Sequence, residues 1–215
     1  MMRSLSEAAA EAATCTRCRL AGGRTQVVYG VGNPTADLLF IGEGPGFHED
    51  RQGEPFVGAA GQLLNRMLGE IGLRREDVYI ANVVKCRPPG NRDPMPDEIE
   101  ACTPWLVEQI SLIQPRVIVT LGNFATKFVL NTSTGITRLR GQTFTWHGRT
   151  VIPTFHPAAI LRGGGEGSLQ FEELRADFGT VRATLDDLER RAKEATEAPP
   201  DEPIALGEDE QLGLF

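Results

Sequence analysis

Residues that could form a binding site follow three apolar runs of the sequence. The loop Gly42-Glu43-Gly44-Pro45-Gly46 follows the run 38–41, Asn82 follows a second run, and His156 precedes Pro157 at the end of a third. Ligands of parallel sheets bind beyond the carboxyl ends of the strands. We therefore expect the carboxylate of Glu43, the amide of Asn82 and the imidazole of His156 to meet in one crevice.

The four cysteines are the second group of residues with evident chemistry. Cys15 and Cys18 form a C-x2-C pair, and Cys86 and Cys102 follow with fifteen residues between them. A single site of four thiolates would use all of them, and C-x2-C pairs suit zinc or an iron–sulfur cluster. Zinc ribbons usually carry two such pairs, and the second half here is not one. Four unrelated buried thiols are the alternative, because free cysteines are common in cores.

The elements that would position these residues alternate between strands and helices. This order predicts an α/β fold with a central, mainly parallel four-stranded sheet and helices on both faces. We expect 97–113 to form two helical pieces, because Pro104 suits a first helical turn. Strands are expected at 38–41, 78–86, 115–122 and 149–157, and helices at 4–13, 61–72, 97–113, 123–130 and 171–188.

Length and charge allow one domain, expected at 1–190, with a flexible acidic tail at 191–215. The net charge of −7 is carried by seven acids in 194–215, and residues 1–193 balance at 22 acids and 22 bases. Whole-chain charge therefore neither favours nor excludes a nucleic-acid partner. The absence of an 18-residue apolar run and of a signal-peptide pattern predicts a cytoplasmic protein with no membrane partner. Disulfides are not expected in that compartment.

Five motifs in order resemble the family 4 uracil-DNA glycosylases, the iron–sulfur members of the uracil glycosylase superfamily. They are CTRC, GEGPG, GEPFVGAAG, VYIANVVKCRPPGNRDP and HPAAILR, and the resemblance runs from about Cys15 to Leu188. It implies hydrolytic removal of uracil from single- or double-stranded DNA in base excision repair, by a monofunctional, monomeric enzyme. It also implies one 4Fe-4S cluster with a structural role. Gly44 departs from the alanine more common in the family, which leaves a backbone contact possible.

The resemblance also implies roles for the strand-end residues around a deoxyuridine rotated out of the DNA. His156 would donate to uracil O2 as negative charge develops, a contact typically worth about 3 kcal/mol of barrier. Asn82 would accept from uracil N3–H and donate to O4, a pattern that cytosine reverses. Phe56 would stack on the base. The structural alternatives are a turn at His156, a loop-supporting amide at Asn82 and a core ring at Phe56.

Glu43 is the remaining candidate for catalysis. It could orient the attacking water or interact with the cationic sugar, as carboxylates do at similar transition states. The family also allows it only a backbone contact to uracil, so no general base is assigned. The backbone of Gly42, Gly44 and Gly46 completes the expected substrate-binding set.

DNA contacts are expected from two segments near these residues. Basic side chains would neutralise phosphates, and apolar ones would fill the gap that the flipped base leaves. A solvated surface is the alternative for the basic residues. With four cysteines bound, the cluster would hold the loop 86–102 against the N-terminal helix. The expected DNA-binding residues are Lys85, Arg87, Arg92, Ile160, Leu161 and Arg162.

Two other functions compete with a turning-over glycosylase. Related proteins that capture uracil covalently carry a histidine-bearing insertion after the second strand, and residues 87–101 contain no histidine. A cluster-bearing DNA-binding or electron-transfer module without chemistry is the second alternative. The grouping of Glu43, Phe56, Asn82 and His156 argues against it.

The final residues, QLGLF, resemble the short motif that binds the bacterial sliding clamp. Leu212, Leu214 and Phe215 could enter an apolar groove while Gln211 bonds at its rim. Gly213 departs from the commoner serine or aspartate. Because the acidic segment before the motif is expected to be a flexible tether, docking would raise the local concentration of the enzyme at newly copied DNA. A chance pattern, or an apolar end folded back on the domain, is the alternative.

Overall fold

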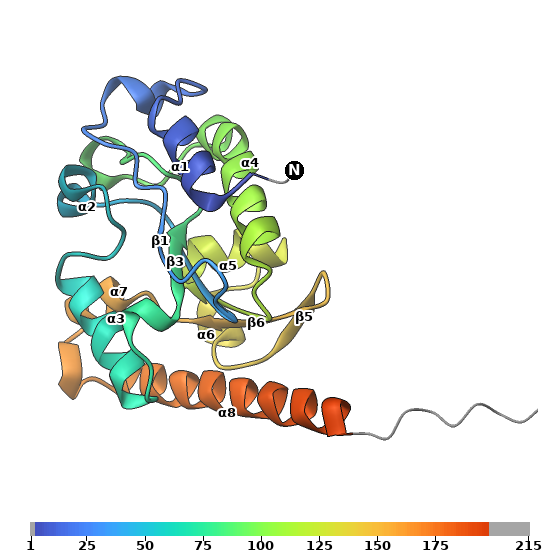
Figure 1. Cartoon of the computed structure of the whole chain (residues 1–215). Coiled ribbons are helices and arrows are strands. Elements are labelled where there is room, and N and C mark those ends of the chain that lie inside the picture. The colour runs from blue at the N-terminus through green and yellow to red at the C-terminus, as the bar shows by residue number, and fades with distance from the viewer. Residues whose placement is uncertain (1–2, 198–215) are drawn as a thin grey trace, which may run out of the picture.

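The protein is an α/β structure built on one mixed six-stranded sheet. A computed structural model describes residues 3–197, and the predicted clamp motif at 211–215 lies outside them. The strand order is β1-β3-β2-β4-β6-β5, with helices on both faces (Figure 1). The predicted fold class is confirmed. Within 3–197, no helix combines the length and the apolarity needed to cross a bilayer.

Four parallel strands form the middle of the sheet, as predicted. They are β2 (Leu38–Gly42), β3 (Tyr79–Asn82), β4 (Val117–Leu121) and β6 (Arg149–Thr154). The predicted count of four strands is corrected to six, because antiparallel strands β1 (Val31–Gly32) and β5 (Phe144–Trp146) cover the two edges. Two- and three-residue strands are too short to give the alternation by which a strand is predicted.

The helices cover the two faces of the sheet, and two of them differ from the prediction. Residues 97–113 are not two pieces: α4 is one helix with Pro104 inside, held by a buried face that includes Trp105 and Leu106. The last helix continues to Glu197, beyond the predicted domain end at 190. The helices are α1 (Leu5–Ala13), α2 (Phe47–Gln52), α3 (Ala59–Glu70), α4 (Pro96–Ile113), α5 (Gly122–Leu130), α6 (Ile136–Leu139), α7 (Pro157–Arg162) and α8 (Leu169–Glu197), and short 3-10 turns lie at Arg19–Gly22, Arg75–Asp77, Pro89–Asn91 and Gly165–Gly167.

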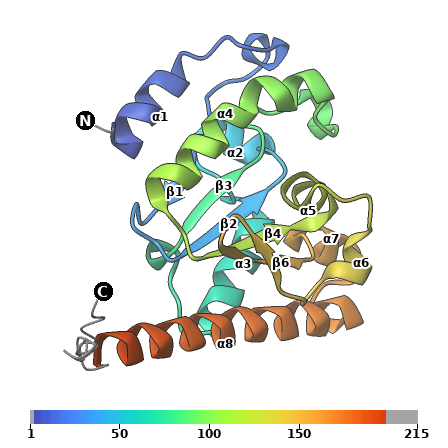
Figure 2. The same cartoon turned by 90° about the vertical axis from the view of Figure 1, so that its right-hand side faces the viewer.

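The core has two layers, one on each face of the sheet. Leu39 and Ile41 of β2 pack with α1, α4 and α5, whereas Phe40 packs with α3 and α8. Figure 2 shows the sheet between α1 and α4 above and α8 below. Phe40 stacks on Phe178 with ring centroids 5.8 Å apart. Because both faces are covered, the central strands are mainly apolar, and the buried Thr120 of β4 is hydrogen-bonded to the Thr126 hydroxyl at 2.9 Å.

Candidate active site and cysteine site

The carboxyl ends of β2, β3 and β6 open into one pocket of about 240 Å³. The structure brings Glu43, Asn82 and His156 together there, as expected from the positions of the strand ends, and places Phe56 beside them, as the resemblance implied. Gly42 lies behind the pocket, where a Cβ would stand 2.4 Å from Asn82 Oδ1 and 2.9 Å from the Phe56 ring. The remaining lining residues are Gly44, Pro45, Gly46, Glu49, Ala60, Pro88, Asn91, Arg92, Ala158 and Arg162.

Asn82 presents an unsatisfied acceptor to the pocket. Its residue is 2% exposed, and its Oδ1 has no hydrogen-bond partner among the residues that the structure describes. A buried polar atom left unpaired costs about 1–3 kcal/mol, so such atoms are rare in folded proteins. The arrangement suits a ligand that supplies an N–H donor to this oxygen. A loop-supporting role would instead leave Oδ1 bonded within the protein.

His156 is held in one tautomer. The backbone N–H of Ala158 donates to His156 Nδ1 at 3.1 Å, which places the proton of the neutral ring on Nε2. Burial, followed by the charge of Arg162, lowers the pKa of His156 to about 4. At neutral pH the residue is therefore an uncharged imidazole with one N–H available to a ligand.

Phe56 is held by its backbone as well as by packing. Its ring stacks on His156 with centroids 5.5 Å apart and an interplanar angle of 26°. Its φ is +53°, a strained value for a bulky residue. The Arg75 guanidinium donates to the carbonyls of Pro55 and Phe56, and a Cβ on Gly61 would overlap the Phe56 carbonyl. No sequence pattern indicated that Arg75 would hold this loop.

Two carboxylates of the pocket occupy different environments. Burial, and then the carboxyl of Asp93, raises the pKa of Glu43 to about 6. Glu49 accepts from the backbone N–H groups of Val57 and Gly58, both at 3.1 Å, and so ties α2 to the loop that carries Phe56. The sequence analysis missed Glu49 and Asp93, because each stands in a polar stretch of sequence where nothing distinguishes it from a solvated acid.

Two residues predicted to contact DNA are buried, and the prediction is wrong for both. Lys85 is 1% exposed, and its ammonium donates to the Asn82 carbonyl at 2.8 Å and to Gln109 Oε1. Ile160 is 1% exposed and belongs to the core below α7. A charge or an apolar side chain enclosed in this way does not reach a phosphate or a base gap.

The other predicted DNA-contact residues lie at or near the pocket mouth. Leu161 is 41% exposed, and Arg162 lines the pocket. Arg92 also lines it, but its guanidinium is bonded to both oxygens of buried Glu98. Arg87 donates to Asn91 Oδ1 at 2.7 Å.

The four cysteines line a second, small cavity at the other end of the β3 loop. All four are free thiols, from the segment after α1, the segment after β3 and helix α4. Three N–H groups donate to their sulfurs: Trp105 Nε1 to Cys15 at 3.4 Å, backbone Lys85 to Cys102 at 3.2 Å, and Arg24 Nη1 to Cys86 at 3.5 Å. Such donors suit thiolates that bind a metal centre.

The chemistry of these sulfurs fits a metal cluster. Burial raises the pKa of Cys86 to about 11 and also raises that of Cys102, so these thiolates need a positive partner. Within residues 3–197, no three His, Cys, Asp or Glu side chains are arranged to hold one metal ion.

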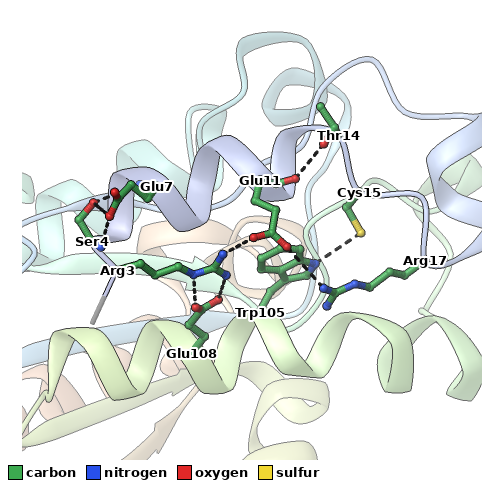
Figure 3. A network of polar contacts seen from close by, with 9 residues as sticks. All are labelled: Arg3, Ser4, Glu7, Glu11, Thr14, Cys15, Arg17, Trp105 and Glu108. Atoms are coloured by element: carbon green, nitrogen blue, oxygen red, sulfur yellow. Dashed lines mark hydrogen bonds and ion pairs between the residues drawn. The ribbon is translucent and has the colours of Figure 1, made fainter. Parts of the chain in front are cut away.

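The N-terminal segment is anchored beside this cavity (Figure 3). Ser4 caps α1 with Glu7 in a reciprocal pair. Arg3 bonds Glu108 of α4 and Glu11 of α1, and the Arg17 guanidinium lies 4.4 Å from the centroid of the Trp105 ring. These contacts join α1 to α4 and bring the C-x2-C pair to the helix that carries Cys102.

Comparison with known proteins identifies the family. A family model described as Uracil DNA glycosylase superfamily matches residues 29–179. The type-4 uracil-DNA glycosylase of Archaeoglobus fulgidus is 51% identical over 168 residues, 74% of this chain and 84% of that protein. The type-4 enzyme of Thermotoga maritima is 49% identical over 178 residues, 82% of this chain and 86% of that protein. The predicted family is confirmed: the chain belongs to the type-4 (family 4) uracil-DNA glycosylases of the uracil-DNA glycosylase superfamily.

Proposed function

We propose that this chain hydrolyses the N-glycosidic bond of uracil in DNA and leaves an abasic site, as in base excision repair. The observation that carries the proposal is the buried, unpartnered Oδ1 of Asn82, placed beside the Phe56 ring and the Nε2–H of His156. These three groups supply an acceptor, an aromatic face and a donor, which together complement a uracil ring. The family of the chain supports the same reaction.

Each residue has a definite part in this reaction. Asn82 Oδ1 accepts from uracil N3–H and its amide donates to O4, whereas cytosine would present like groups to both. His156 donates from Nε2 to O2 as negative charge develops there, and as a neutral ring it needs no proton transfer to do so. Glu43, ionised above pH about 6, stabilises the cationic sugar or orients the attacking water.

A monofunctional hydrolase is proposed, because none of the described residues that line the pocket is a lysine, whose amine would be needed to form a Schiff base. Of the residues described, Lys85 is the lysine closest in sequence to the pocket residues, and its ammonium is bonded to Asn82 and Gln109 instead. The product is therefore an intact strand with an abasic site.

The test is release of uracil from a labelled oligonucleotide, followed by alkaline cleavage. A turning-over hydrolase yields strand breaks only after alkali, in excess over enzyme. Breaks without alkali would contradict the monofunctional assignment, a stable adduct would indicate covalent capture, and no reaction would leave a binding module. A cytosine-containing oligonucleotide is the control, and Asn82→Asp should weaken discrimination between the two as well as the rate.

We also propose that Cys15, Cys18, Cys86 and Cys102 hold one 4Fe-4S cluster. When bound, the cluster supplies a covalent cross-link among segments distant in sequence, not a step of base release. The proposal is supported by the three N–H donors aimed at the sulfurs. Purified protein should be brown, with broad absorbance at about 400 nm, typical of iron–sulfur charge transfer. Colourless protein with stoichiometric zinc would overturn it.

A sliding clamp is the proposed partner of the tail, and the enzyme itself is proposed to be a monomer. The motif Gln211, Leu212, Leu214 and Phe215 supports the first proposal through its sequence alone. A peptide of residues 202–215 should bind the host clamp, and the same peptide with Leu214→Ala and Phe215→Ala should not. If deletion of 207–215 instead unfolds the domain, the segment is a structural latch. Light scattering at assay concentration tests the monomer.

A further inference from the structure

An exposed aromatic side chain lies at the rim of the uracil pocket and has no role in the chemistry described above. Phe47 is the first residue of α2 and is 46% exposed, an unusual position for a phenylalanine. It stands between Gly46 and Glu49, both of which line the pocket. A single exposed apolar side chain is common on protein surfaces, so the groups that accompany this ring decide what it can bind.

Two arginines accompany this ring. The guanidinium carbon of Arg87 lies 5.1 Å from the ring centroid and that of Arg51 lies 5.6 Å from it. Arg51 is one helical turn after Phe47 on α2, and Arg87 precedes Pro88, another lining residue of the pocket. Neither guanidinium has a salt-bridge partner in the described part of the chain, although Arg87 bonds the amide of Asn91.

Arg51 and Arg87 differ from other surface arginines in lacking a carboxylate partner. Arg92, on the same loop as Arg87, is bonded to Glu98, and Arg19 and Arg175 are also paired with carboxylates. At the rim, two guanidiniums without a carboxylate partner in the described residues lie against a half-exposed aromatic ring, which also contacts His48 with ring centroids 5.5 Å apart. Polyanions with planar rings combine the two complementary properties, and the substrate strand is such a polymer.

We propose that Phe47, Arg51 and Arg87 form a platform for the nucleotide that flanks the flipped deoxyuridine in the same strand. When the uridine leaves the stack, its neighbour loses a stacking partner. Phe47 supplies a replacement aromatic face for that neighbouring base, and the two arginines turn toward the adjoining phosphates. Because every base has a π face, the platform tolerates any neighbouring sequence. This inference rests on uracil-containing DNA being the substrate.

The decisive experiment asks whether the effect of a Phe47 substitution on DNA binding depends on the presence of the neighbouring base. The probes are single-stranded oligonucleotides with 2′-fluoro-2′-deoxyuridine, which resists hydrolysis because fluorine destabilises a cationic sugar. One probe is complete, and two others carry a tetrahydrofuran abasic residue directly 5′ or directly 3′ of the uridine. Dissociation constants are measured by anisotropy for the wild-type protein, Phe47→Ala, Phe47→Leu, Phe47→Tyr and Val107→Ala. Val107 is an exposed apolar residue of α4 that does not line the pocket, and it serves as the control.

We expect the loss of the Phe47 ring and the loss of the neighbouring base to weaken binding by similar factors, and the two losses together to weaken it no more than either alone. Phe47→Ala and Phe47→Leu should weaken binding of the complete probe about 5- to 160-fold, the range for one stacked base, whereas Phe47→Tyr and Val107→Ala bind normally. One of the two abasic probes should bind the wild-type protein more weakly than the complete probe, by a similar factor. Phe47→Ala protein should bind that abasic probe and the complete probe with the same dissociation constant. If the two losses multiply instead, the ring does not stack on that base and the platform is refuted.

Two further outcomes are separated by the same data. A folding defect in Phe47→Ala would weaken all three probes equally, and this also counts against the platform. Wild-type protein that fails to release uracil from an ordinary oligonucleotide would refute the proposed function itself. Arg51→Gln and Arg87→Gln should each reduce the slope of log K against log salt by about 0.7, the value for one phosphate on a single strand. Unchanged slopes would remove the arginines from the proposal.

Discussion

The uracil pocket and the cysteine site lie at the two ends of one short segment after β3, yet they are built in opposite ways. At the pocket, Asn82 Oδ1 is unpartnered and Phe56 has a strained backbone. At the cysteine site, three of the four sulfurs receive N–H donors, and salt bridges join the surrounding helices. The pocket is left incomplete, as a ligand that comes and goes requires, whereas the cysteine site is enclosed, as the permanent cluster that we propose would require.

Lys85 connects these two regions. Its backbone N–H donates to Cys102, and its side chain reaches back to the Asn82 carbonyl. Gln109 continues the connection, accepting from Lys85 and donating to the Tyr29 carbonyl at 2.8 Å. These hydrogen bonds form a continuous path from the cysteine site to Asn82, the residue that we propose reads the base.

The largest effect is expected from breaking the cysteine site. Cys86→Ala should abolish the absorbance near 400 nm and most of the soluble yield, because the segments it joins are far apart in sequence and would close only at an entropic cost. Iron content and the yield of soluble protein measure the outcome. Arg87→Ala, one residue away and outside the cysteine set, is the matched control. A colourless but well-folded and active Cys86→Ala protein would show that the site is dispensable.

The next effect is expected in the pocket alone. His156→Ala should slow single-turnover uracil release by roughly 10²–10³-fold, the usual consequence of losing one donor to developing negative charge. The cysteine site should keep its colour, since His156 is remote from it in the fold. Wild-type rates in this variant would mean that another group stabilises O2.

Lys85→Met tests whether the two regions communicate. Methionine removes the ammonium and its bond to the Asn82 carbonyl while it roughly preserves buried volume. We expect a loss of uracil over cytosine discrimination on the order of tenfold, because one such hydrogen bond to a charged group is worth about 1.5–3 kcal/mol. A merely structural residue would lower the melting temperature and leave discrimination unchanged.

The pH profile separates Glu43 from His156. Because the pKa of Glu43 is raised to about 6, its carboxylate is lost as the pH falls through that value, and the rate should fall about tenfold per pH unit below it. His156, with its pKa lowered to about 4, stays neutral across this window and adds no inflection. Glu43→Gln should give a flat profile between pH 5 and about 8. A persistent inflection in that variant would assign the titration to another group.

The two regions also differ in how far the sequence predicts them. Polar residues at strand ends are conspicuous after apolar runs, so the meeting of Glu43, Asn82 and His156 in one pocket follows from parallel-strand geometry. The burial of Lys85 does not follow, because a lysine between an apolar strand and an arginine has the pattern of an exposed basic loop. Ile160 was misplaced for a related reason: the inward face of a six-residue helix is set by tertiary packing.

The smallest effect is expected from Trp105→Phe, which removes one hydrogen-bond donor from the cysteine site and leaves the pocket unchanged. Phenylalanine keeps an aromatic face for Arg17 but removes the N–H that donates to Cys15. Hydrogen bonds to sulfur help to set the reduction potential of an iron–sulfur cluster, and the loss of a donor leaves more negative charge on the ligand. The potential measured by voltammetry should therefore fall, while uracil release stays unchanged because the pocket contains no part of this contact. Trp105→Phe protein with an unaltered potential would show that the indole serves packing alone, and slower base release would show that the cysteine site acts on the pocket through α4 as well as through Lys85.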